Sequence, residues 1–197
     1  MQFRSSVRDE EGWETLSAAT KCDAQHATVE EVEVRSPARP KGHRWTVVRR
    51  KPAVVIAAIT ADGKLILINE ERIPVQAALW SVPAGQIDEG QEIEDAVRRE
   101  LLEETGYELA QAGKLIPLGH YFTSPGFTDE RGHFFLARPV VLSPAGPAHH
   151  DSESILECRP FSPAELADMI ARNEIRDSNT LSICAVLVSR GYLSLGH

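Results

Sequence analysis

Two long apolar runs dominate the middle of the chain. Residues 53–59 and 65–68 are entirely aliphatic, and Asp62-Gly63 lies between them. A run without polar interruptions is typical of a strand that is covered on both faces, and Asp-Gly between two such runs is a strong signal for a hairpin turn. The pattern therefore predicts two adjacent, buried central strands.

A helical period follows over residues 92–105. Ile93, Val97 and Leu101 recur every four residues, so a helix would carry them as one apolar stripe against a sheet. Gly106 comes directly afterwards and is typical of a helix stop. The stretch predicts an amphipathic helix that packs on the central strands.

The remaining apolar runs predict a mixed α/β domain. Strands are expected over residues 115–118, 133–137 and 155–161, and two closing helices over 163–172 and 179–189. Ser162 offers an N-cap for the first of these helices, with Pro163 in its first turn and Glu165 at its third position. Strands with helices before and after them indicate an α/β/α sandwich around a mixed β-sheet.

The N-terminal quarter has a different pattern. Residues 1–26 are polar and are expected to be weakly ordered at their start. Two short β-rich runs, 28–34 and 45–48, flank a turn-prone segment rich in Pro. They predict a small antiparallel β appendage over residues 27–50, too short to be stable alone. We expect it to pack on the main domain, residues 51–197, or on a second subunit.

Composition narrows the class of protein. The chain has 197 residues, of which 42% are hydrophobic, so it can bury one good core. Its net charge of −8 argues against a nucleic-acid polymer as partner. Three widely spaced cysteines without paired motifs favour a reducing compartment. No apolar signal core or membrane-length run occurs, so we expect a cytoplasmic protein without a membrane partner.

Three glutamates cluster at the end of the predicted helix. Glu100, Glu103 and Glu104 stand at positions i, i+3 and i+4 and would share one side of the helix. They could form a solvated acidic helix end, although the helix dipole disfavours acids at a C-terminus. Alternatively, they could bind a hard divalent cation, and oxygen ligands of this kind suit Mg²⁺ or Mn²⁺.

Residues 85–107 resemble the Nudix box, in which Gly, five residues, Glu, seven residues, Arg-Glu, an apolar residue, any residue, Glu-Glu, any residue, Gly and an apolar residue follow one another. The matching positions are Gly85, Arg99, Glu100, Leu101, Glu103, Glu104, Gly106 and Tyr107. Six identical residues at fixed spacing would arise by chance in about 10⁻⁸ of windows at ~5% usage per residue type. The resemblance implies the Nudix fold and hydrolysis of a nucleoside diphosphate linked to another moiety. Gln91 departs from it, because it stands where the family has Glu.

Three other segments resemble the ADP-ribose pyrophosphatase and nucleoside diphosphate sugar branch of this family. Residues 80–90 are similar to its WELPAGxIDEGE segment, with Ser81 in place of Glu, and residues 124–130 are similar to its SPG-x-x-x-E loop. Residues 70–72, Glu-Glu-Arg, stand where the branch has Gln-Tyr-Arg. The resemblance implies a nucleotide-sugar substrate such as ADP-ribose, with GDP-mannose as an alternative, and a homodimer in which residues 27–50 contribute to dimerisation and substrate binding.

The resemblance also implies roles for single residues. Glu100, Glu103, Glu104 and the backbone carbonyl of Ala84 would hold the metal, and Glu103 and Glu104 would thereby take part in catalysis. Glu153 would be the general base, with Asp151 and Glu157 as alternatives. The candidates for substrate binding are Trp45, Arg49, Arg72, Ser124 and Glu130. Gly85, Arg99 and Gly106 would be structural, and Glu89 or Glu92 would replace the missing carboxylate at Gln91 as the partner of Arg99.

Simpler interpretations compete with several of these roles. The loop at 124–130 could be an ordinary turn, and Trp45 could be a core residue. Arg49 and Arg50 could meet phosphates, but solvated strand-end charges are favoured for both, and Arg72 could be such a charge as well. For the whole chain, the alternatives to an enzyme are a Nudix sensor domain without turnover and an interaction protein whose acidic helix is merely surface.

Overall fold

The computed structural model describes residues 12–147 and 154–196. The chain forms two compact units. The first comprises Met1–Pro52 with Phe122–Arg131, and the second comprises Ala53–Tyr121 with Gly132–His197.

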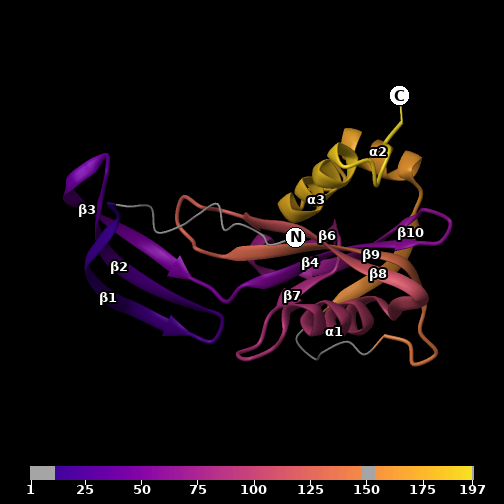
Figure 1. Ribbon diagram of the computed structural model, residues 1–197, viewed down its shortest axis with the longest axis horizontal. Coiled ribbons are helices and arrows are strands. Elements are labelled where there is room, and N and C mark those ends of the chain that lie inside the picture. Colours follow the sequence, from indigo (N-terminus) through magenta and orange to yellow (C-terminus); the bar gives the residue numbers. More distant parts are fainter. Residues whose placement is uncertain (1–11, 148–153, 197) are drawn as a thin grey trace. The chain divides into compact units, whose positions relative to one another are not determined.

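The first unit is built on a three-stranded antiparallel sheet in the order β1-β2-β3 (Figure 1). Its strands are β1 (Glu14–Ala24), β2 (Ala27–Ser36) and β3 (Arg39–Arg49). β2 and β3 are the two strands predicted for the appendage. β1 was not predicted, because all eleven of its positions are exposed and its sequence lacks the alternation of apolar and polar residues that marks a half-buried strand.

The second unit contains a mixed sheet with the strand order β10-β5-β4-β9-β8. These strands are β4 (Ala53–Thr60), β5 (Leu65–Arg72), β8 (Tyr107–Phe122), β9 (Arg131–Leu142) and β10 (Ile155–Phe161). β4 runs parallel to β9 and antiparallel to β5, which confirms the hairpin predicted at Asp62-Gly63. Two short strands join the sheet without having been predicted: β6 (Ala77–Ser81) pairs with β5, and β7 (Ala84–Gln86) pairs with β4.

Helices cover both faces of this second sheet (Figure 1). α1 (Ile93–Thr105) lies on one face, while α2 (Pro163–Ala171) and α3 (Ser178–Ser189) lie on the other. At the start of α2 the predicted capping box forms, since Ser162 Oγ accepts the backbone N–H of Glu165. None of the helices in the described parts of the chain is long and apolar enough to cross a membrane.

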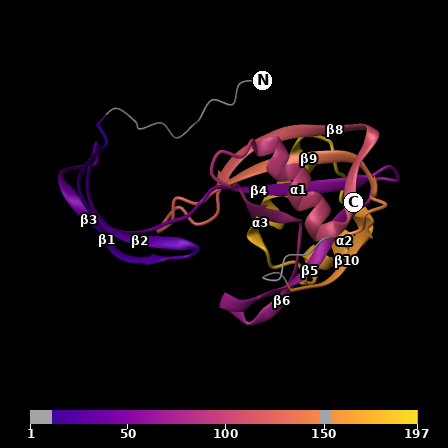
Figure 2. The ribbon, with the colours of Figure 1, turned by 90° about the horizontal axis from the view of Figure 1, so that it is seen from below.

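β4 shows why its sequence is apolar at every position. Val55 and Ala57 pack in the core on the side of α2 and α3, whereas Val54 and Ile56 pack in the core under α1. Figure 2 shows β4 running beside α1. Successive side chains of a strand point to opposite faces, so a strand between two helical layers has no polar face. The predicted α/β/α sandwich is confirmed.

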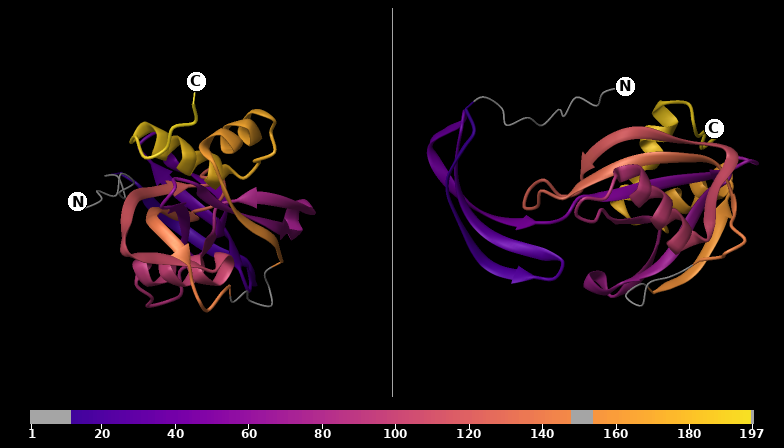
Figure 3. Two further views of the ribbon diagram at one scale, coloured as in Figure 1. Left: turned by 90° about the vertical axis from the view of Figure 1, so that its right-hand side faces the viewer. Right: turned by 60° about the horizontal axis from the view of Figure 1, so that its bottom comes forward.

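A hairpin extends from one edge of this sheet. β5 and β6 are joined by a short 3₁₀ turn (Ile73–Val75), and the views in Figures 2 and 3 show this hairpin projecting from the body of the second unit. The side chains of Ile73 and Val75 at its tip are largely exposed.

Candidate active site

The contact between β7 and α1 positions the first glutamate of the cluster. Glu100 is 4% exposed, and its carboxylate lies directly against the backbone of Gly85. A Cβ atom on Gly85 would overlap this carboxylate. Gly85 is therefore required for the close approach of helix and strand, and not for an unusual backbone angle.

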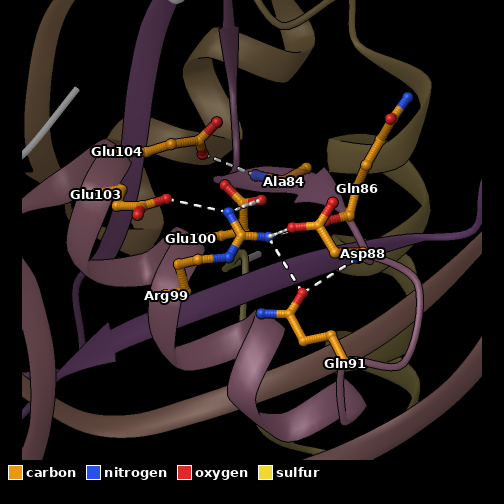
Figure 4. Close-up of polar contacts among 8 residues, drawn as sticks. All are labelled: Ala84, Gln86, Asp88, Gln91, Arg99, Glu100, Glu103 and Glu104. Carbon is orange, nitrogen blue, oxygen red and sulfur yellow. Dashed lines mark hydrogen bonds and ion pairs between the residues drawn. The ribbon is translucent and has the colours of Figure 1, made fainter. Parts of the chain in front are cut away.

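The second buried glutamate holds the neighbouring residue of β7. Glu104 is 3% exposed, and its carboxylate accepts a hydrogen bond of 2.9 Å from the backbone N–H of Ala84 (Figure 4). Ala84 and Gly85 pair with Val55 and Val54 of β4. Two carboxylates one helical turn apart are thus fixed against the centre of the sheet.

Arg99 links the helix to the loop that precedes it (Figure 4). One guanidinium nitrogen lies 2.8 Å from Glu100 and 3.0 Å from Glu103, and the other donates a 2.9 Å hydrogen bond to the carbonyl of Gln86. Partial burial opposes the charge on Arg99, but the charges and hydrogen bonds of Glu100 and Glu103 outweigh it and raise the pKa of the guanidinium.

Gln91 keeps a structural role without the charge of a glutamate. Its amide oxygen accepts the backbone N–H of Asp88 at 3.2 Å and faces a guanidinium nitrogen of Arg99 at 3.4 Å. Asp88, at 4.0 Å, is the loop carboxylate nearest to Arg99. Among the residues the structure describes, neither Glu89 nor Glu92 pairs with Arg99, so the expectation that one of them would replace the missing carboxylate is wrong: both side chains point into solvent.

The chemistry of these residues fits a hard divalent cation. Glu100, Glu103 and Glu104 supply oxygen donors, two of them are buried, and the carbonyl of Ala84 is an oxygen donor on the adjacent strand. In the described ranges, no three acidic, histidine or cysteine side chains converge closely enough to hold a metal ion. Arg99 lies between Glu100 and Glu103, while Glu104 turns toward Ala84 (Figure 4). The groups available to a cation are thus the same groups that hold Arg99 and β7.

Gly106 ends α1 as predicted from the sequence. Its φ of 71° is left-handed, and its N–H bonds to the carbonyl of Leu102 at 2.9 Å. A Cβ atom there would also crowd Pro147. The site residues Ala84, Gly85, Arg99 and the three glutamates therefore lie together in the second unit, close to the end of one helix.

Arg72 also belongs to the second unit, at the end of β5. Its guanidinium lies 2.9 Å from the carboxylate of Glu70, so it is not simply a solvated strand-end charge. A cavity opens beside it in the β5–β6 hairpin, lined by Glu71, Arg72, Ile73, Gln76, Ala77 and Ala78.

The other substrate-binding candidates lie in the first unit. Trp45 on β3 is 49% exposed, which contradicts a core role, and its indole N–H donates a 2.9 Å hydrogen bond to the carbonyl of Gly126. Arg49 pairs with Glu30 at 2.9 Å and with Asp129 at 3.1 Å. The hydrogen bond that Arg49 donates to Glu30 is the largest cause of the raised pKa of Arg49. Arg49 is therefore committed to two carboxylates.

Ser124 and Glu130 lie at the two ends of a loop that is bound to β3. The carbonyl of Ser124 accepts the N–H groups of Phe127 and Thr128, so this part is a turn. The carboxylate of Glu130 is held by Arg50 at 3.0 Å and by the hydroxyl of Thr123 at 3.1 Å. The structure thus brings Trp45, Arg49, Ser124 and Glu130 together within one unit.

The structure describes only one of the three candidates for the general base. Glu153 and Asp151 lie outside the described residues. Glu157 is half exposed and pairs with Arg159 at 3.1 Å, and the guanidinium of Arg159 lies over the ring of Phe161. The carboxylate of Glu157 is thus engaged with an arginine on its own strand.

Several contributing residues were not singled out from the sequence. Gln86 and Asp88 both lie within the box. Gln86 accepts a hydrogen bond from Arg99 through its backbone carbonyl, and the carboxylate of Asp88 lies 4.0 Å from Arg99; residue spacing reveals neither contact. Arg50, which directly follows β3, was considered only as a phosphate contact or a solvated charge, and its ion pair with Glu130, 80 residues further along the chain, was not foreseen. Cys158 on β10 lies beside Glu104 and donates to the carbonyl of Thr105 at 3.7 Å.

Cysteine reactivity is expected to follow this environment. Burial, with the charges of Glu104 and Glu157, raises the pKa of Cys158 to about 11, and burial raises the pKa of Cys184 to about 12. Since the thiolate is the nucleophile, about one Cys158 in 10³ is reactive at pH 8, and its rate should rise about tenfold per pH unit. Alkylation with iodoacetamide at pH 8, followed by peptide mass spectrometry, should label the exposed Cys22 first. Equal labelling of all three would contradict the described burial.

Fold and site together define the family. The profile of the NUDIX domain matches residues 49–182, and the chain belongs to this family. It is 32% identical over 152 residues to ADP-ribose pyrophosphatase of Bacillus subtilis (strain 168), covering 77% of this chain and 78% of that protein. It is 31% identical over 165 residues to GDP-mannose pyrophosphatase of Escherichia coli O1:K1 / APEC, covering 79% and 80%. A crystal structure of an ADP compounds hydrolase shares the fold, with a TM-score of 0.72 and 21% identity over 95% of this chain and all of that one.

Proposed function

We propose that this protein is a Nudix pyrophosphohydrolase that requires Mg²⁺ or Mn²⁺ and cleaves the pyrophosphate bond of ADP-ribose or a related nucleoside diphosphate sugar. ADP-ribose would give AMP and ribose 5-phosphate. The observation that carries the proposal is the pair of buried glutamates, Glu100 and Glu104, fixed against β7 in a chain of the Nudix family. The names of the relatives support the substrate class.

The metal would be held by Glu100, Glu103, Glu104 and the carbonyl of Ala84. A divalent cation bound there neutralises charge on the pyrophosphate and lowers the pKa of a water molecule. Arg99 keeps Glu100 and Glu103 oriented and ties them to the loop through Gln86, which makes it a positioning residue. Gly85 leaves room for Glu100.

The chain's other residues would bind the substrate and accept a proton. Arg72 would meet the phosphates, Trp45 would stack on the base, and Glu130 with Ser124 would contact the terminal sugar. Arg49 would stabilise the loop rather than meet the substrate, because two carboxylates already engage it. Glu153 would take the proton from the attacking water, with Asp151 as the alternative.

A substrate panel tests the proposal. The purified protein is incubated with Mg²⁺ and, separately, ADP-ribose, GDP-mannose and UDP-glucose, and the products are identified by mass spectrometry. We expect a nucleoside monophosphate and a sugar phosphate from at least one substrate, with loss of turnover in EDTA. Turnover of none would favour the sensor alternative.

GDP-mannose is the second candidate substrate, favoured by the E. coli relative. The sensor alternative rested on Gln91, which lacks the charge that the family has at this position. That argument is weakened, since the amide oxygen of Gln91 still contacts Asp88 and Arg99. No partner other than a small-molecule substrate is needed for the reaction.

We also propose that the protein is a homodimer in which the N-terminal sheet contacts the second subunit. Within the first unit, β1 is exposed at all its positions, and Trp13, Leu16 and Trp45 are exposed large side chains. A small sheet needs an apolar face that is covered to be stable, and no position of β1 is buried within the chain. Light scattering should give about twice the 21.7 kDa chain mass. A Trp45→Glu variant should shift the equilibrium toward monomer, whereas a monomeric wild type would contradict the proposal.

A further inference from the structure

Glu70 is a buried carboxylate beneath a partly exposed arginine. Its side chain is 9% exposed, that of Arg72 is 39% exposed, and the two charged groups are 2.9 Å apart. Glu70 lies on the same face of β5 as Ile66, which packs in the core under α1. A buried carboxylate is costly unless it is paired, so this ion pair constrains Arg72 more strongly than a solvated surface pair would.

Ser81 lies on the same face of the neighbouring strand. The register of β5 and β6 pairs Ile68 with Ser81 and Glu70 with Leu79, so Glu70 and Ser81 are diagonal neighbours. Ser81 is 2% exposed, and its hydroxyl oxygen has no hydrogen-bond partner among the described residues. A buried hydroxyl without a partner is unfavourable, so Ser81 leaves a polar atom unused beside Glu70.

The same face continues toward the buried glutamates of the site. Cys158 of β10 pairs with Ile68 of β5, and it lines a pocket together with Glu104. The ion pair of Glu70 and Arg72 therefore shares one sheet face with Glu104. Arg72 also lines the cavity of the β5–β6 hairpin, where its guanidinium is accessible to a ligand.

Both positions are among those where the sequence departs from the branch that it resembles. Position 81 has Ser where Glu is usual, and position 70 has Glu where Gln is usual. The fold makes these positions neighbours, so this chain has one carboxylate on this face, on β5 at position 70, where the branch has one on β6 at position 81.

We propose that Glu70 is a positioning residue that directs Arg72 toward a phosphate of the substrate, in place of a carboxylate at position 81. The inference rests on the proposed function, since it assigns Arg72 to substrate binding. An arginine fixed in this way binds phosphate oxygens through two nitrogens, which a mobile arginine does less well.

The first test is the variant Glu70→Gln, which keeps the shape and removes the charge. KM for ADP-ribose, or for the substrate that the panel identifies, should rise about 10- to 100-fold, as expected for loss of a charge-assisted contact. Because Glu70 acts through binding, kcat should stay within about threefold of wild type. Glu174→Gln is the matched control: this exposed glutamate also pairs with an arginine, Arg172 at 2.8 Å, but lies after α2 and away from the hairpin cavity, so its loss should not change KM. Thermal unfolding of each variant verifies that it is folded.

The second test restores the charge from the other strand. Adding Ser81→Glu to Glu70→Gln should return KM to within about threefold of wild type, and Ser81→Asp serves as a smaller version if the first double variant does not fold. An unchanged KM in Glu70→Gln, or a failure of both double variants to recover it, would overturn this inference alone. A wild type that turns over no nucleotide sugar would overturn the proposed function and the inference with it.

Discussion

A Glu104→Gln variant is expected to fold normally and to lose about 10³-fold in kcat. Glutamine keeps an oxygen that can accept the hydrogen bond from the N–H of Ala84, so the contact of α1 with β7 should survive. The charge is lost, and a metal site contributes several kcal/mol to a reaction in which each 1.36 kcal/mol is worth tenfold. Steady-state kinetics with Mg²⁺ and thermal unfolding are the measurements.

The matched control for this variant is Glu94→Gln. Glu94 lies on the first turn of the same helix and is exposed, so its loss should leave kcat unchanged. A Glu104→Gln enzyme with activity within about twofold of wild type would sink the assignment of Glu104 to the metal, whereas loss of activity in both variants would point to a general effect of charge.

Gly85→Ala is expected to damage both stability and activity. A methyl group at this position would overlap the carboxylate of Glu100, so the helix or the side chain must shift. Overpacking of this kind costs about 1–3 kcal/mol, which corresponds to a fall in Tm of about 2–12 °C for a chain of this size. Because Glu100 would leave its position, turnover should fall by about 10² or more, as for other misplaced catalytic groups.

Two further variants identify the cause. Gly90→Ala introduces a methyl group into open space at a φ of 76°, so it tests backbone strain without overlap and should retain activity. In a Gly85→Ala/Glu100→Ala protein the overlap is gone, so the stability losses of the two single variants should not add. Turnover should stay low, because the carboxylate of Glu100 is missing. Additive losses of Tm would contradict the steric explanation.

The fold was largely predictable where the physical signal is local. The uninterrupted apolar runs of β4 and β5 and the stripe on α1 reflect burial on both faces of a sheet, and a capping box reports the start of α2 directly. β1 carries no such signal, because a strand exposed on both faces needs no apolar residues. β7 is three residues long, which is too short for any period to be recognised.

For the site, spacing predicted which residues gather but not what they contact. The interval between Glu100 and Glu104 follows from helical geometry, whereas the overlap of Glu100 with Gly85 depends on how closely α1 approaches β7. Arg49 pairs with Asp129 as well as with Glu30, and Arg50 pairs with Glu130; no sequence pattern relates positions 80 residues apart. Sequence reasoning favoured free arginines at these positions because it weighs each residue against its neighbours in the chain.

The loop that carries Ser124 and Glu130 connects β8 to β9, yet backbone hydrogen bonds join it to β3. Residues 122–131 and the N-terminal sheet therefore form one structural unit, which two separate stretches of the sequence encode. A chimera that took the first 52 residues from a relative would pair a foreign strand with a native loop and would lose the Arg49–Asp129 and Arg50–Glu130 contacts wherever the partner differed. Such a chimera is expected to keep this unit intact only when both stretches are moved together.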